Sequence, residues 1–180
     1  MSVFSFPEAE LDRMAREVAA YMRQQRECYY PRGGPLAAAH VVPLESYVPP
    51  GFLSRVRVLE LHGERIPDPP FYEEARRRFE KFPRFQHMSS LTFIDVVVFN
   101  DVISQRSLFH GLVHVVQFQV LGVDKYCSLF VRAFVRAGSH LQVPLEAQAY
   151  QLDARFAQSP RQGFSLEKEV RQWADEGRFL

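Results

Sequence analysis

The stretch between residues 105 and 121, which is mostly apolar from Leu108 onward, constrains the fold of this chain more than any other feature. It reads QRSLFHGLVHVVQFQVL, with Ser104 before it and Gly122 directly after it. Serine favours the first position of a helix, so Ser104 or Ser107 is suited to cap it, and glycine favours the position beyond the last turn. Drawn as a helix, the segment carries apolar side chains around nearly its whole circumference. Such a helix needs other elements on every side, so the sequence predicts a buried central helix over 105–121.

The remaining segments supply helices and strands to surround this central helix. With 180 residues, of which 47% are apolar, the chain is long enough for one domain with a sizeable core. We therefore expect a single domain over 1–180, of class α+β, in which a small twisted sheet packs on several helices. Helices are predicted over 7–27, 71–81, 124–137 with Asp124 as cap, 144–158, and from Ser165 through Trp173; strands are predicted over 55–61 and 91–99 (LTFIDVVVF); a proline-rich irregular connection is predicted over 31–51.

The charge and hydropathy patterns argue against several classes of protein. Lys+Arg number 22 and Asp+Glu 21, so we expect neither a nucleic-acid partner nor an anionic membrane partner. No apolar run approaches the roughly 18 residues of a transmembrane helix. The N-terminus lacks the basic start and apolar stretch of a secretory signal, which favours a cytoplasmic location. Cys28 and Cys127 are expected to be small buried apolar side chains rather than a disulfide.

Two histidines lie four residues apart on the predicted central helix. His110 and His114 stand one turn above each other, with their Cβ atoms roughly 5–6 Å apart. The pair could be two histidines satisfied separately within the core. On an otherwise apolar helix, however, each polar ring needs a partner, and one shared metal ion satisfies both. The spacing therefore favours a metal site on this helix.

A third ligand is expected from the next helix along the chain. Glu146 lies in the first turn of the helix predicted over 144–158, and the apolar spacing Leu145, Ala149 and Leu152 packs that helix on the core. A carboxylate in a first turn is also favoured by the helix dipole alone. Together with the histidine pair, we interpret Glu146 as a metal ligand.

These residues resemble a known family. FHGLVHVVQFQVLG followed by VPLEAQAYQLDARF is similar to the zincin-like metallopeptidases of the H-E-x-x-H type with a glutamate as third ligand. The resemblance covers about residues 90–157. It implies a zincin-like fold, His110, His114 and Glu146 as the ligands of zinc, and the segment 91–99 as the strand along which peptide substrates lie.

The sequence departs from the family at position 111. Where the motif has the glutamate that takes a proton from the metal-bound water, this chain has Gly111. The glutamate is not a metal ligand, so metal binding does not require it. We expect the metal site to persist while ordinary peptidase chemistry is lost or rerouted. If the protein is an enzyme, the proton would move through Asp153, a tyrosine such as Tyr126 or Tyr150, water or the substrate. A glutamate introduced at position 111 is expected to point toward the water side of the site. The alternative is steric: Gly111 makes room for a substrate or another side chain, and a glutamate would clash and displace the metal.

Four further side chains are candidates for roles around the metal. Gln117 lies on the helical face of the two histidines and is a candidate hydrogen-bond partner for a ligand, or a buried amide satisfied by backbone. Asp153 shares the face of Glu146 and could orient a ligand histidine, or pair with Arg155 or Arg132. Tyr126 and Tyr150 could offer a phenol to a bound oxyanion, or pack in the core.

The expected function is therefore a metal-binding, zincin-like protein derived from a metallopeptidase, with two histidines, one glutamate and an open coordination position. The ligand in its cleft would be a peptide or a small molecule. Two alternatives stay open at this point: a non-haem Fe(II) enzyme, which uses the same two-histidine, one-carboxylate set, and a non-catalytic peptide-binding pseudoenzyme.

Overall fold

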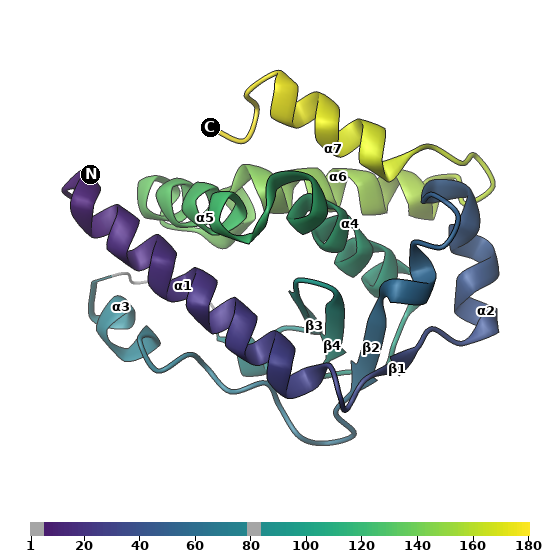
Figure 1. Ribbon diagram of the computed structural model, residues 1–180, viewed down its shortest axis with the longest axis horizontal. Helices are drawn as coiled ribbons and strands as arrows, with labels where there is room; N and C mark the ends of the chain where they lie inside the picture. Colours follow the sequence, from purple (N-terminus) through teal and green to yellow (C-terminus); the bar gives the residue numbers. More distant parts are fainter. Residues whose placement is uncertain (1–5, 79–83) are drawn as a thin grey trace.

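The computed structural model describes residues 6–78 and 84–180, and the fold is α+β (Figure 1). A layer of helices lies along one side of the molecule, a small sheet lies on the other, and the long first helix runs diagonally across this view. The helices are α1 (Glu8–Tyr29), α2 (Ala38–Val41), α3 (Tyr72–Arg78), α4 (Gln105–Leu121), α5 (Val123–Ala137), α6 (Pro144–Gln158) and α7 (Leu166–Asp175), and the strands are β1 (Gly34–Pro35), β2 (Arg57–Glu60), β3 (Ser90–Phe93) and β4 (Val96–Phe99).

The sheet has the strand order β1-β2-β4-β3, with β2 and β4 parallel and the two outer pairs antiparallel. All four side chains of β4 are buried, because both faces of the sheet are covered. Val97 and Phe99 point into the main core with α4, whereas Val96 and Val98 point to a smaller cluster with Tyr21 and Tyr29 of α1. This alternation is the two-residue period expected of a strand.

Helix α4 lies in the middle of the molecule, as the sequence predicts, and its ends coincide with the predicted ones. The Ser107 backbone N–H donates to Ser104 Oγ at 3.0 Å, and the Ser104 N–H donates to Ser107 Oγ at 3.1 Å, so the two serines cap the helix reciprocally. Gly122 ends it with φ of +78°, a backbone conformation that favours glycine. From Leu108 to Phe118, every position except His110 is buried.

The prediction of one strand over 91–99 is wrong: the segment LTFIDVVVF is a hairpin of β3 and β4. Phe93 pairs with Val96, so Ile94 and Asp95 form a two-residue turn. Ile94 has φ of +63°, which a β-branched residue rarely adopts. Arg26 of α1 binds both carboxylate oxygens of Asp95, at 2.8 and 2.9 Å, and holds the turn from outside. The turn lacks glycine, and the contact that stabilises it comes from a distant part of the chain.

Smaller corrections concern other segments. The connection over 31–51 is not wholly irregular, because it contains β1, α2 and a 3-10 turn over Val42–Tyr47. Asp124 lies in the first turn of α5 rather than capping it, because Gly122 occupies the cap position. Cys127 is buried but Cys28 is exposed, and both thiols are free. The predicted helix over 71–81 is described as far as Arg78, and its last residues lie outside the described part. Among the described residues, no helix is long and apolar enough to cross a membrane.

Candidate metal centre

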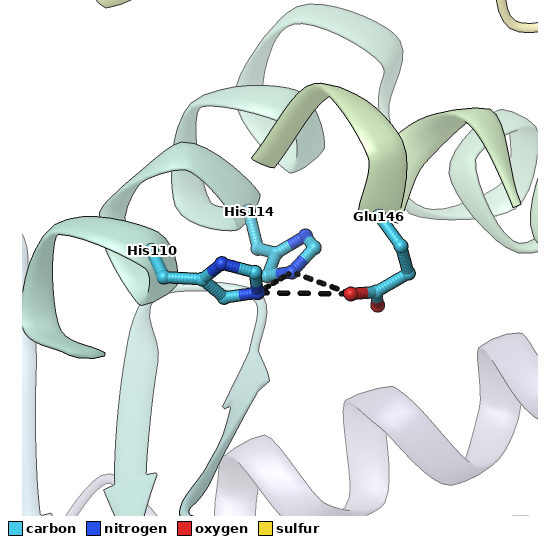
Figure 2. Close-up of side chains that lie close together, drawn as sticks. All are labelled: His110, His114 and Glu146. Atoms are coloured by element: carbon cyan, nitrogen blue, oxygen red, sulfur yellow. Dashed lines mark hydrogen bonds and ion pairs between the residues drawn. The ribbon is translucent and has the colours of Figure 1, made fainter. Parts of the chain in front are cut away.

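The packing of α4 against α6 brings the three predicted metal ligands together (Figure 2). The Nε2 atoms of His110 and His114 lie 3.1 Å apart. Glu146 Oε2, from the first turn of α6, lies 3.6 Å from each of them. Both rings and the carboxylate point toward one common position between the two helices.

These separations fit one tetrahedral metal ion. Ligand atoms about 2.0–2.1 Å from a tetrahedral zinc stand roughly 3.3 Å from one another, close to the 3.1 and 3.6 Å found here. Two histidine nitrogens and one carboxylate leave a fourth position for water or a ligand, which is the arrangement of catalytic rather than closed structural zinc sites. The same set also suits Fe(II), so geometry alone does not choose between the two metals.

The outward nitrogen of His110 is held by a carboxylate. His110 Nδ1 donates to Asp153 Oδ2 at 2.9 Å, and Asp153 is almost completely buried. Arg106 completes the group, with its Nε and Nη2 donating to Asp153 Oδ1 at 3.0 and 2.8 Å. Asp153 therefore pairs with Arg106 and orients His110, whereas Arg155 and Arg132 pair with other carboxylates. An acidic partner on the outer nitrogen keeps the lone pair of Nε2 directed inward.

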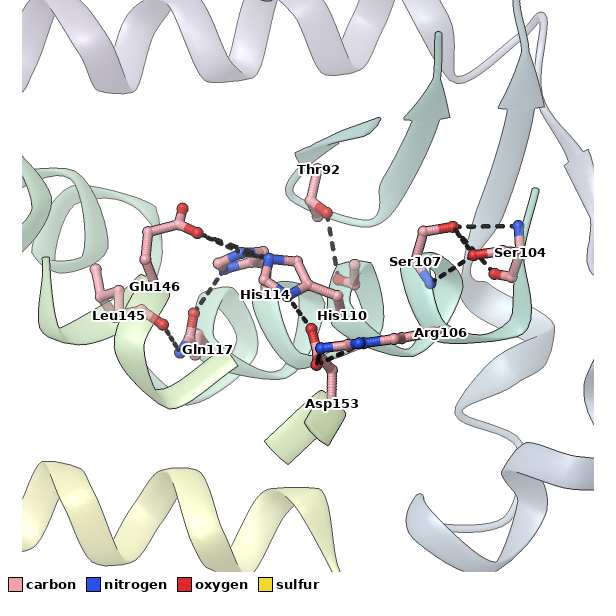
Figure 3. A network of polar contacts seen from close by, with 11 residues as sticks. Thr92, Ser104, Arg106, Ser107, His110, His114, Gln117, Leu145, Glu146 and Asp153 are labelled. Carbon is pink, nitrogen blue, oxygen red and sulfur yellow. Dashed lines mark hydrogen bonds and ion pairs between the residues drawn. The ribbon is translucent and has the colours of Figure 1, made fainter. Parts of the chain in front are cut away.

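The outward nitrogen of His114 is held by a buried amide (Figure 3). Gln117 Nε2 donates to the carbonyl of Leu145 at 2.9 Å and to Gln148 Oε1 at 3.0 Å, which fixes the orientation of the Gln117 amide. Its Oε1 therefore faces His114 Nδ1, at 2.9 Å, and accepts a hydrogen bond from it. His114 Nε2 is then left with a lone pair that faces His110.

Two inward lone pairs and a carboxylate oxygen repel one another unless a positive charge lies among them. In the metal-free protein, a proton supplies that charge. Burial lowers the pKa of His110, but hydrogen bonds to Asp153 and Glu146 outweigh it and raise the pKa to about 9. Burial acts to raise the pKa of Glu146, yet the charges and hydrogen bonds of His114 and His110 hold it far below its usual range. A cation at this position, whether a proton or a metal ion, would relieve that repulsion.

At position 111, which also borders the cleft, the packing favours the steric alternative. A Cβ atom at Gly111 would lie 2.6 Å from Val97 Cγ1 and 3.2 Å from Val97 Cγ2, so position 111 faces β4 of the sheet. The carbonyl of Gly111 accepts a hydrogen bond from Thr92 Oγ1, on β3, at 3.2 Å. Glycine here allows the helix and the sheet to approach closely, and a larger side chain would displace Val97 before reaching the metal ligands.

The two tyrosines have different surroundings. Tyr126, on α5, is buried, and its hydroxyl lies 3.2 Å from His114 Nδ1, which is the outward nitrogen. It therefore supports the ring of His114 and does not face the inner nitrogen. Tyr150 is 43% exposed and its ring centroid lies 4.6 Å from that of His110. Of the two, Tyr150 is the phenol placed to contact a ligand, and burial with the charge of Glu146 raises its pKa.

The metal ligands open into a cleft of about 680 Å³. His110, His114 and Glu146 line it together with Tyr150, residues of β3 and side chains from α1, α3 and α5. That volume lies within the range of ordinary small-molecule sites, about 300–1,000 Å³.

Three residues of this site were not predicted from the sequence: Arg106, Gln148 and Thr92. Arg106 lies four residues before His110, on the same helical face, so its spacing was an available signal. Gln148 is completely buried and links Gln117 to α7, where its Nε2 donates to the Glu169 carbonyl at 3.1 Å. Its contact with Gln117 depends on how α4 packs against α6, which no spacing in the sequence specifies.

Comparison of the chain with family models, with curated proteins and with solved structures found no match. The functional argument therefore rests on the geometry of the site.

Proposed function

We propose that this protein binds one divalent transition metal, with zinc expected, through His110, His114 and Glu146, and presents the open coordination position to a ligand in the cleft. The observation that carries the proposal is the convergence of two histidine Nε2 atoms and one carboxylate oxygen within 3.6 Å, with both outer nitrogens engaged by Asp153 and Gln117. Outer partners of this kind are what metal-binding histidines ordinarily have.

A bound zinc would supply Lewis acidity to a water or carbonyl in the open position. The side chains of this chain supply the rest: Asp153 and Gln117 orient the rings, and Tyr150 lies beside His110 with a partly exposed phenol. The position that would carry the general base of a zincin-like peptidase is Gly111, which packs against Val97. The proposed activity is therefore metal-dependent ligand binding, without ordinary hydrolysis of peptides.

The first test is metal content. Protein purified without added metal, then dialysed, should retain about one metal per chain by elemental analysis, and His110→Ala/His114→Ala should retain none. His140→Ala is the matched control, because His140 lines the same cleft outside the three-residue group. Failure to bind zinc, iron, manganese or nickel with better than millimolar affinity would refute the proposal.

Assays on the same purified protein distinguish the two alternative functions, a non-haem Fe(II) enzyme and a peptide-binding pseudoenzyme. Iron in aerobically and anaerobically purified samples, with oxygen-dependent colour, would favour a non-haem Fe(II) enzyme. Ligand binding in the cleft without turnover would favour the pseudoenzyme. Metal-dependent proteolysis by the unmodified chain would mean that a residue other than position 111 moves the proton.

A further inference from the structure

The cleft continues well beyond the three metal ligands, and its chemistry changes along its length. On one side of His110 it is lined by Ser104, Arg106 and Ser107 at the start of α4. Elsewhere it is lined mostly by apolar side chains of α1, α3 and α5, with Glu10, Arg13 and Glu17 of α1 also at its wall. A binding site with one polar and one apolar part selects ligands that have the same division.

The apolar part of the cleft is formed mainly by side chains of α1 and α5. Met14, Val18 and Met22 are spaced four residues apart on α1, line the cleft, and are only partly buried. Phe130, on α5, lines the same cleft and is also partly buried. Leu141, at the cleft, is 55% exposed. Apolar surface exposed to water in one continuous wall is unfavourable, and an apolar ligand would cover it.

The polar part carries a cation with donors to spare. Arg106 stands one helical turn before His110, and its side chain is 58% exposed. Its Nε and Nη2 bind Asp153, while Nη1 has no hydrogen-bond partner among residues 6–78 and 84–180. Nη1 can therefore donate to an anion in the cleft, from the side of His110 that carries Nδ1 and Asp153.

We propose that the cleft binds an anionic amphiphile, an unbranched apolar chain that ends in a carboxylate. The chain would lie along Met14, Val18 and Met22, and the carboxylate would lie between Arg106 and the metal ligands. The wall formed by α1 offers no partners for the backbone N–H and C=O groups of a peptide. The edge strand β3 also lines the cleft and could pair with a peptide, so peptides are tested as competitors. Methionines adapt to a flexible chain without a fixed shape. The ligand class rests on the proposed metal site only for the coordination of the head group.

Dodecanoate is the probe, with dodecanol as its uncharged counterpart, and binding is measured by calorimetry on metal-loaded and on metal-free full-length protein. We expect one dodecanoate per chain and at least tenfold weaker binding of dodecanol. Across hexanoate, octanoate and decanoate, affinity should rise by up to about fourfold for each methylene buried.

Variants test which residues contact the carboxylate of the ligand and which contact its apolar chain. Arg106→Gln should weaken dodecanoate binding about tenfold, as expected for a lost hydrogen bond to a charged group, and leave dodecanol unchanged. Val18→Glu, in the middle of the wall, should weaken both ligands. Ala20→Glu is the matched control, because Ala20 is exposed on the same helix and does not line the cleft. Circular dichroism and metal content of each variant show whether a loss of binding is a loss of fold.

The outcomes distinguish this inference from the proposed function. Stoichiometric metal without dodecanoate binding would overturn the inference and leave the metal site standing. Absence of metal with carboxylate-selective binding that depends on Arg106 would support the inference and refute the metal site. Equal affinity for dodecanoate and dodecanol, no dependence on chain length, or preferential binding of peptides that dodecanoate does not displace would each overturn the inference.

Discussion

The hydrogen on Nδ1 of each histidine decides what Nε2 can do. In His110 that hydrogen is donated to Asp153, and in His114 it is donated to Gln117. One partner is a carboxylate with a charge, and the other is a neutral amide whose own donors are both engaged. The two rings therefore both direct Nε2 to the centre, but only His110 has a charged outer partner.

Asp153→Asn should weaken metal binding about 10- to 100-fold, the usual effect of changing an outer partner of a ligand. The amide can keep the contact but not the charge that supports His110. Competition with a chromophoric chelator measures the affinity. Asp175→Asn is the control, since Asp175 is exposed at the end of α7. An affinity unchanged by Asp153→Asn would show that Asp153 serves Arg106 alone.

Metal binding at neutral pH should release a proton. Burial lowers the pKa of His110, its hydrogen bonds to Asp153 and Glu146 raise it by more, and the resulting value is about 9. At pH 7 the ring is therefore protonated in the metal-free protein, and the metal displaces that proton. Calorimetry in buffers of different ionisation enthalpy should report about one proton released per metal at pH 7, and fewer as the pH rises above 9. No release at pH 7 would contradict the interpretation.

Gly111→Ala should destabilise the protein even though alanine is the better helix former. The new Cβ would lie 2.6 Å from Val97 Cγ1 inside the core. Overpacking of this kind costs about 1–3 kcal/mol, against a gain of about 1 kcal/mol in helix propensity. Urea unfolding of the metal-free variant measures the difference. In a Val97→Ala background the penalty of Gly111→Ala should shrink or reverse, and additivity of the two changes would show that they do not touch.

At the scale of elements, helices α4 and α6 were predicted with their observed ends because local residues specify them. Ser104 and Gly122 bound the first helix, and Pro144 begins the second. These helix ends are therefore determined by residues that lie next to them in the sequence. The hairpin of β3 and β4 could not be read in this way. Its turn uses Ile94 where glycine would be usual, and Arg26, far away in the sequence, stabilises it.

The candidate ligands could be chosen for a similar reason, since His110 and His114 share one helical face and Glu146 begins another helix, and the structure brings the three together. Their surroundings were not. The contact of Gly111 with Val97, and of Gln117 with Gln148, depends on how distant elements pack. The spacing of residues along the sequence indicates the candidate ligands. The direction in which the residues between them face depends on tertiary packing.

The amide of Gln148 joins α4, α6 and α7. It accepts from Gln117 and donates to the carbonyl of Glu169, and it is completely buried. Gln148→Met keeps a comparable volume but leaves both partners unsatisfied, which should cost about 1–3 kcal/mol. Hydrogen exchange should quicken in α7 more than in α1. Gln151→Met, on the exposed side of α6, is the control. Equal exchange in both helices would mean that the amide does not hold α7 in place.

At the scale of the whole molecule, a metal that binds only the folded state stabilises the entire domain. At a thousandfold excess over its dissociation constant the gain is about 4 kcal/mol, roughly 8–16 °C in melting temperature for a domain of this size. Chelation should lower the melting temperature by that order, and His110→Ala should abolish the response. A melt that does not change after verified metal removal would show that the metal contributes little to folding.

The close approach of α4 to the sheet also limits which single amino-acid substitutions at position 111 the protein could tolerate. A carboxylate at position 111 would be placed against Val97, so an exchange of glycine for glutamate alone loses packing before it offers a base. A smaller residue at position 97 alone leaves a gap and offers nothing in return. A glutamate at position 111 can therefore be accommodated only when the residue at position 97 becomes smaller at the same time. Variants that acquire hydrolysis should therefore be found in libraries that vary both positions at once, and be missing from those that vary either one.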